Sequence, residues 1–337
     1  GGGALGLLLG GVLMQLTSWQ WLFFINLPIG LVSFAVGWRF LPRGRKLGLA
    51  AGLDVVGAVL LVSSVSLLVY AVIGAEHLGW GGTTLAYLGG AAILLIGFVI
   101  RQRRAKVPLL DLAVLRDRDV AGANVIQFLV TGGLYGSFFI ATLLLQQVLG
   151  YAPMQMALSF VPLAVITAIA SILIAPFLVR RFRERVALVV GLLVYVAGAL
   201  LLARVPLDGA YAADVLAPLL LLGLGIGTVL PPIMSLAMST AQEDEVGVVS
   251  GLANSTGMIG GALWTAIVAS VIGSATGALV ASGVVRREAL HHGLMLGSFT
   301  LAAVLAVALA VALFVLRRRG DGADGGEPRA QTLVAGH

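Results

Sequence analysis

The sequence predicts an all-α membrane protein built as a bundle of spanning helices. Of its 337 residues, 59% are hydrophobic and only 11% are charged, whereas a soluble domain carries about 25% charged residues. The apolar residues form ten successive runs, most of them long enough to cross the hydrocarbon core as a helix. The runs do not alternate apolar and polar residues as a barrel strand does, and no soluble domain separates them.

The ten runs define the predicted spans. They lie near residues 2–17, 21–41, 54–74, 84–100, 120–148, 154–179, 186–204, 213–239, 247–273 and 292–316. The first run is short for a span of about 20 residues and no Met precedes it, so we expect an N-terminally truncated sequence that begins inside a helix. The lack of cysteine excludes disulfides, thiolate metal sites and cysteine nucleophiles. We expect no metal and no cofactor.

The basic residues predict the topology. Eighteen of the 21 lie on one side of the predicted membrane, after the second, fourth, sixth and tenth runs, and only Arg204, Arg286 and Arg287 lie on the other. The positive-inside rule makes the first side cytoplasmic, which places the C-terminus in the cytoplasm. Basic loops at a cytoplasmic leaflet explain the net charge of +6 without a nucleic-acid partner.

A polar stripe marks the run 120–148. At 100° per residue its polar side chains fall within about a third of the helix circumference, and the rest of the run is apolar. The stripe consists of Asn124, Gln127, Thr131, Tyr135, Thr142 and Gln146, with Phe138 at its edge. Polar side chains do not face lipid, so the stripe faces a water-filled cavity or forms hydrogen bonds between helices.

Two later runs add candidate residues. In the run 247–273, Asn254 shares a face with small residues, which indicates close packing and makes Asn254 a second cavity candidate. In the run 213–239, Pro231 and Pro232 predict either a hinge or a fixed kink. The interiors of the ten runs hold no Asp, Glu, Lys or His, and no catalytic motif occurs, which disfavours an intramembrane enzyme.

The N-terminal stretch carries a family resemblance. Gly2, Gly6 and Gly10 share one helix face, and the run from Gly2 through Gly10 and Gly11 resembles the antiporter signature in the fifth span of major facilitator exporters. A plain packing seam is the alternative. The segment 18–30 resembles the junction into the sixth span of the fourteen-span drug:proton antiporters, although Gly3 stands where proline is usual.

The resemblance extends over all but the tail and implies a division of the chain. The chain would hold spans five to fourteen of the family scheme: 1–42 as the truncated end of the N-terminal half, 43–100 as an inserted helix pair, 101–118 as a cytoplasmic linker, 119–317 as the C-terminal six-helix half and 318–337 as a disordered tail. The segment 176–185 resembles a cytoplasmic loop signature. That likeness implies a gate formed by Arg180, Arg181 and Arg185, with lipid-headgroup contact as the alternative, and Arg183 stands where glycine is commoner.

The resemblance also implies a function. It is that of a secondary transporter of the cell (inner) membrane that exports lipophilic drugs or antibiotics by alternating access, driven by protons whose binding site lies in the first spans of the family. A facilitator or importer of a small metabolite, and a scaffold or sensor without flux, remain alternatives. The polar stripe favours a transporter over a scaffold, and the glycine signature near Gly6 favours export over import.

Overall fold

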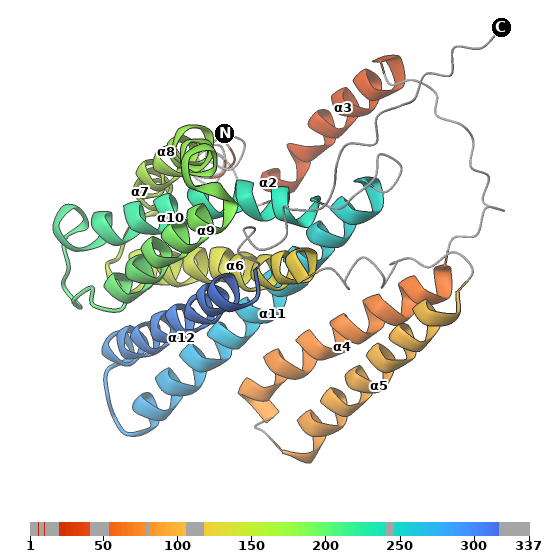
Figure 1. The fold of residues 1–337 in the computed structure, drawn as a ribbon. Coiled ribbons are helices and arrows are strands. Elements are labelled where there is room, and N and C mark those ends of the chain that lie inside the picture. Colours follow the sequence, from red (N-terminus) through yellow and green to blue (C-terminus); the bar gives the residue numbers. More distant parts are fainter. Residues whose placement is uncertain are drawn as a thin grey trace, which may run out of the picture.

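The computed structural model describes residues 6, 10, 20–40, 54–78, 81–105, 118–239 and 246–316, and within them the regular structure is helical, with no strand (Figure 1). This confirms the predicted fold class. Seven helical stretches of the described residues are long and apolar enough to cross a membrane. One of them runs for 50 residues, from Pro153 to Leu202, and contains a kink at Arg183. It therefore accounts for two of the predicted spans.

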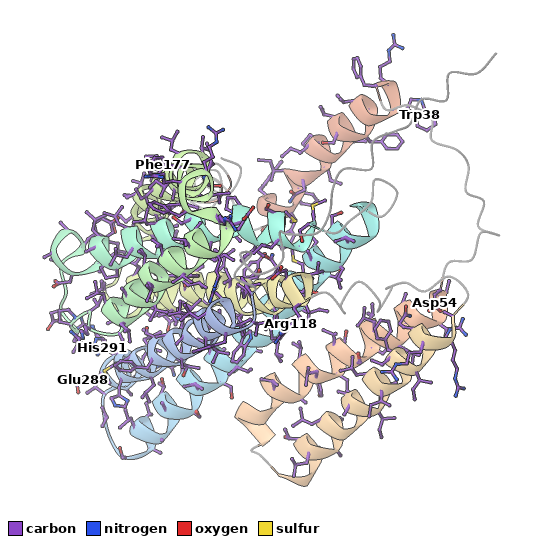
Figure 2. The ribbon with its side chains drawn as sticks, viewed as in Figure 1. Trp38, Asp54, Arg118, Phe177, Glu288 and His291 are labelled. Carbon is purple, nitrogen blue, oxygen red and sulfur yellow. The ribbon has the colours of Figure 1, made fainter. Side chains whose placement is uncertain are left out.

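The first two predicted spans are only partly described. Gly6 is exposed and Gly10 is half-buried, whereas Gly2 and Gly11 lie outside the described residues. The second span consists of α2 (Trp21–Phe24) and α3 (Asn26–Phe40), and Ile25 between them keeps helical backbone angles. No residue of α3 is buried, and Trp38 lies on its projecting end (Figure 2).

A pair of helices follows. α4 (Val55–Leu78) and α5 (Gly82–Arg104) lie side by side, as Figure 1 shows. They approach closely because α5 presents glycine: a Cβ added to Gly90 would lie 3.1 Å from the Leu67 side chain. α4 also packs along α11.

The remaining helices form a bundle around α6 (Arg118–Leu143), whose last turn widens into the π-helical segment η3 (Leu144–Val148). α6 packs against α10, α11 and α12, and 61% of its apolar stretch is buried, more than in any other candidate span. The other elements are α7 (Pro153–Ser159), α8 (Val161–Ile169), η4 (Ala170–Ile174), α9 (Ala175–Leu202), η5 (Tyr211–Val215), α10 (Leu216–Ala237), α11 (Val246–Ala281) and α12 (Arg286–Phe314).

Alternating glycines let α10 pack between two neighbours. A Cβ on Gly223 would lie 2.9 Å from the Thr167 hydroxyl of α8, and one on Gly225 would lie 2.7 Å from the Cα of Tyr195 on α9. Without side chains at these positions, the three backbones come close, as small residues allow in membrane bundles. Further along, α10 continues as helix through Pro231 and Pro232 to Ala237, and a hinge at the proline pair stays a prediction.

The π-helical segment η4 precedes Pro176. A proline inside a helix lacks its N–H, and its ring collides with the carbonyl four residues earlier, which here belongs to Ile172 within η4. The wider i→i+5 turn relieves this collision, so the helix continues into α9.

Arg183 makes the turn between the two spans of the long helical stretch. Its φ of 73° and ψ of 167° lie outside the helical region, in a conformation that is essentially restricted to glycine and costs other residues about 1–3 kcal/mol. The chain thus turns at this position although arginine stands where glycine is commoner.

Replacing Arg183 with glycine is expected to stabilise the protein by about 1 kcal/mol, because glycine adopts this conformation without strain. Thermal unfolding of the purified protein in detergent measures the effect. Arg181→Gly is the matched control, since Arg181 is also exposed but lies within the helix, where glycine costs about 1 kcal/mol. A loss of stability in both variants would contradict the prediction.

Candidate functional site

Part of the polar stripe lies against a glycine-lined face of α11. A Cβ on Gly257 would lie 2.9 Å from the Gln127 amide nitrogen and 3.1 Å from the Thr131 hydroxyl, and one on Gly261 would lie 2.5 Å from the nearest atom of the Tyr135 ring. The glycines therefore provide the room that these polar side chains occupy. We call this contact, Gln127, Thr131 and Tyr135 against Gly257, Gly260 and Gly261, the α6–α11 seam.

The α6–α11 seam is closed on one side and open on the other. Thr131 is buried at 7% exposure, Gln127 is half-buried and donates a hydrogen bond of 3.3 Å to the Thr131 hydroxyl, and Tyr135 is 44% exposed. Asn254, one helical turn before Gly257, is also exposed. An amide, a hydroxyl and an aromatic ring without fixed charge are thus presented at its edge, a combination that suits amphipathic molecules of varied structure.

The rest of the stripe faces other neighbours. Asn124 is buried and donates to the Val120 carbonyl, while its Oδ1 has no hydrogen-bond partner among the described residues. Phe138 packs against Phe160 at 5.2 Å between ring centroids, and Gln146 donates to the sulfur of Met156 on α7. Thr142 is half-buried. The predicted stripe therefore divides between the α6–α11 seam and the α7–α8 side of α6.

Two aromatic residues lie beside the α6–α11 seam: Trp264, which the sequence places at the edge of the Asn254 face, and Phe128, which it does not single out. Trp264 of α11 packs over Gly132, where an added Cβ would lie 2.7 Å from the indole Cγ, and its ring meets Phe128 edge-on at 6.4 Å between centroids. The indole N–H is buried and has no partner within the part of the chain that the structure describes. The available signal is Gly132, because a small residue inside a membrane helix is typical of a position where a neighbouring helix approaches closely.

A buried hydroxyl pair anchors the side of α6 that faces α9. Ser137 donates to the Gly133 carbonyl at 2.6 Å, and its oxygen lies 3.2 Å from the hydroxyl of Tyr195. Tyr195 is fully buried in the apolar core. A satisfied polar pair in such surroundings fixes the rotation of a helix, and so it orients the stripe on α6.

The arginines of the predicted gate have different surroundings. Arg180 and Arg181 are exposed, whereas Arg185 donates to the Ala312 carbonyl at 3.2 Å and also to the Leu313 carbonyl. These carbonyls belong to the last turn of α12, where a cation is favourable because the helix dipole is negative. The contacts observed for Arg185 are thus with the end of α12, and the gating role stays a prediction.

The two ends of the bundle differ in charge. Arg185 meets the end of α12, and Gly122, near the start of α6, lies beside Leu316, so these basic segments share one end. Figure 2 shows Arg118 at that end and Glu288 and His291 at the other. The structure thus separates Arg118 and Arg185 from Arg287, as the predicted topology requires.

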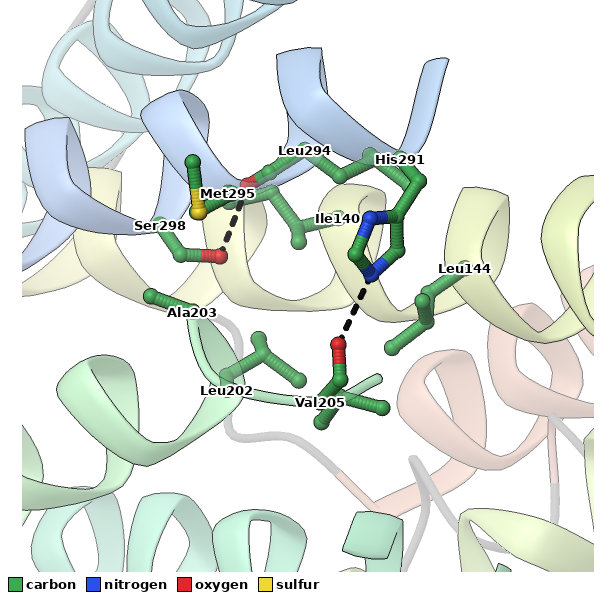
Figure 3. A pocket seen from close by; sticks show the side chains of 9 residues that line it. All are labelled: Ile140, Leu144, Leu202, Ala203, Val205, His291, Leu294, Met295 and Ser298. Atoms are coloured by element: carbon green, nitrogen blue, oxygen red, sulfur yellow. Dashed lines mark hydrogen bonds between the residues drawn. The ribbon is translucent and has the colours of Figure 1, made fainter. Parts of the chain in front are cut away.

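At the second end, α12 contacts the end of η3 and the loop after α9. Arg287 donates to the Val148 carbonyl at 2.8 Å, the Leu207 carbonyl at 3.0 Å and the Asp208 carboxylate at 2.9 Å. One turn later, a ring nitrogen of His291 lies 2.7 Å from the Val205 carbonyl, beside a small hollow with a mostly apolar lining (Figure 3). These contacts join the end of α6 to the loop after α9.

The fold and the seam define a multi-pass helical membrane protein with an uncharged polar face between two of its helices. Residues 1–265 match the sequence model of the Major Facilitator Superfamily, and the chain belongs to that superfamily. Membership places it among membrane transporters rather than enzymes, as the sequence predicts.

Several relatives are named for drug resistance or export. The chain is 36% identical over 284 residues to a puromycin resistance protein of Streptomyces alboniger, covering 83% of this chain and 56% of the relative. It is 33% identical over 296 residues to a cephamycin export protein of Amycolatopsis lactamdurans, covering 87% and 60%. A tetracenomycin C resistance and export protein of Streptomyces glaucescens is 31% identical over 275 residues, covering 81% and 51%. The chain thus spans little more than half the length of these relatives.

Proposed function

We propose that the chain forms part of a proton-coupled exporter of lipophilic drugs or antibiotics, of the fourteen-span type, in the cell (inner) membrane with its C-terminus in the cytoplasm. The superfamily match and the relatives named for resistance and export support the transport class. The observation that carries the substrate class is the open edge of the α6–α11 seam, where an amide and an aromatic ring without fixed charge stand beside glycine backbone.

The proposed mechanism is alternating access. α6 to α12 act as one half that rocks against the other half around a central cavity, and α4 and α5 are the inserted pair. In this arrangement Gln127 offers a hydrogen bond to substrate and Tyr135 offers its ring for stacking. The interiors of the spans hold no Asp, Glu, Lys or His, so the proton-carrying group is expected elsewhere in the full transporter.

Two further elements have proposed roles in the rocking motion. Pro231 and Pro232 leave the carbonyls of Gly227 and Thr228 without their intrahelical donors, which makes this part of α10 easier to bend. Arg180 and Arg181 are exposed at the end that the charge count makes cytoplasmic, where an acidic partner or lipid headgroups can bind them.

Alanine at Gln127 or Tyr135 is expected to change which drugs a full-length version exports. Losing one hydrogen bond or ring contact of about 1.4 kcal/mol corresponds to about a tenfold change in affinity, and the change should differ between a hydrogen-bonding drug such as puromycin and a planar cation such as ethidium. Resistance and efflux in cells that lack their own exporters measure it.

The matched control is Phe299→Ala on α12, because Phe299 and Tyr135 are both 44% exposed. The control should leave the pattern of resistance unchanged. An unchanged pattern in the Gln127 and Tyr135 variants, at normal expression, would count against the seam as the substrate site.

A further inference from the structure

A buried carboxylate closes one end of the α4–α5 pair. The side chain of Asp54, at the start of α4, is 1% exposed and is labelled in Figure 2. Its Oδ1 accepts a hydrogen bond from the backbone N–H of Gly57 at 2.9 Å and one from Arg101 Nε at 3.0 Å, and its Oδ2 accepts one from the Gln102 amide at 2.8 Å. We call Asp54, Gly57, Arg101 and Gln102 the Asp54 clasp.

The Asp54 clasp depends on the absence of a side chain at Gly57 and on the opposite dipole charges of the two helix ends that meet there. A Cβ on Gly57 would lie 2.5 Å from the Gln102 amide nitrogen and 2.8 Å from the Asp54 carboxyl carbon, so Gly57 leaves the space in which the groups meet. The carboxylate sits at the positive N-terminus of α4, and Arg101 sits in the last turn of α5, at its negative end.

The clasp stays ionised at physiological pH. The Gly57 N–H, followed by the side chains of Arg101 and Gln102, lowers the pKa of the Asp54 carboxyl below its ordinary value, against the opposing effect of burial. A lowered pKa adds stability above the ordinary value, and that stability is lost only as the pH falls through the lowered value. The three donors around the Asp54 carboxylate thus favour a lasting link between the two helices.

The clasp is one of several contacts that make the pair a unit. Between the helices, Gly97 lies 3.8 Å from Leu60 and Gly90 lies 3.1 Å from Leu67, each measured from an added Cβ. Toward the other end, the rings of Tyr70 and Tyr87 meet edge-on at 5.3 Å. Both the charged end and the aromatic end are thus joined across the two helices.

The unit touches the bundle through α11. α4 packs along α11, and α11 packs against α6, where Gly257, Gly260 and Gly261 set the width of the α6–α11 seam. α11 is therefore held between the helix that carries the polar stripe and the clasped pair.

We propose that Asp54 is a positioning residue: by clasping α4 to α5 it makes the pair a stiff brace that holds α11 at its seam with α6. The part of this inference that concerns substrate handling rests on the proposed function. The part that concerns the brace does not, because it follows from the contacts between the helices.

The brace is tested first by hydrogen exchange on the full-length protein in lipid nanodiscs. Asp54→Asn removes the charge but keeps a good helix cap, and Arg101→Gln removes the cation. Both should speed amide exchange at least threefold in the first turn of α4, the last turn of α5 and the segment 257–264 of α11. Arg101→Lys, which keeps the charge, should restore much of the protection.

Arg103→Gln is the matched control, because Arg103 is an exposed arginine in the same turn of α5. It should leave exchange unchanged. Faster exchange confined to the ends of α4 and α5, with 257–264 as slow as in the wild type, would overturn the brace. The brace would also be overturned if Arg103→Gln speeded amide exchange in 257–264 as much as Asp54→Asn does.

Efflux kinetics test the positioning role separately. Asp54→Asn should change the ratio of the KM values for puromycin and ethidium by about threefold or more, which a mere loss of folded protein leaves constant. A constant ratio would overturn the positioning role. If the wild type exports neither drug, the proposed function fails for these probes, while the exchange at 257–264 still decides whether the brace exists.

Discussion

Alanine at Gly260 is expected to force α11 away from α6 and to destabilise the protein by about 3 kcal/mol, the upper end of the usual range for overpacking. The added Cβ would lie 2.8 Å from the Cα of Phe128 and closer still to its carbonyl oxygen. These are backbone atoms of a buried helix, so no change of rotamer relieves the collision. The thermal midpoint and the monodisperse yield in detergent measure the loss.

Gly251→Ala on the same helix is the control. Gly251 is exposed, and nothing lies within 4 Å of an added Cβ, so alanine should be neutral or should stabilise the helix by up to about 1 kcal/mol. If both variants lose stability equally, the close approach of α11 to α6 is not what Gly260 provides.

Alanine at Arg287 is expected to cost about 2 kcal/mol, because it removes a charged donor from two backbone carbonyls and one carboxylate. A hydrogen bond from a charged group contributes about 1.5–3 kcal/mol, and the partial exposure of Arg287 reduces the sum. Thermal unfolding again gives the effect, and the loss should persist in high salt, since the carbonyl contacts are not ion pairs.

Two control variants separate the contribution of the Arg287 ion pair from that of its carbonyl contacts. Arg286→Ala removes an exposed arginine of the same helical turn and should have little effect. Asp208→Ala removes only the exposed ion pair, which is typically worth less than 1 kcal/mol. A loss in Asp208→Ala as large as that in Arg287→Ala would mean that the ion pair, and not the carbonyl contacts, accounts for the stabilisation by Arg287.

The helical fold was predictable because a bilayer leaves a long apolar chain few ways to satisfy its backbone. The separation of Arg118 and Arg185 from Arg287 followed from charge counting. The π-helical segment before Pro176 was not predictable, because it depends on how the neighbouring turn accommodates a single residue. Arg183 is a mixed case: the sequence places a connection between two spans here, but it does not show that an arginine would adopt the glycine-like backbone of the turn.

The candidate site was predictable in part. Helical periodicity places Gln127, Thr131 and Tyr135 on one face of α6, and the structure keeps them together at α11. Helical periodicity does not identify the neighbouring helix that a side chain contacts. It therefore assigned Phe138 to the same stripe, although Phe138 packs on Phe160, on the α7–α8 side of α6. Arg185 binds carbonyls 127 and 128 residues away, and a local motif carries no information at that range.

The central position of α6 has a consequence for biosynthesis. The end of this helical stretch, at Val148, is contacted by Arg287, which lies 139 residues later in the chain. At a translation rate of about 5–20 residues per second, roughly ten seconds pass before that contact can form. For the first part of this interval, until α10 and α11 are synthesised, the glycines and polar side chains of α6 lack the helices that later cover them. A ribosome stalled before α11 would thus leave a membrane intermediate whose most polar span is unshielded, a natural target for quality-control proteases.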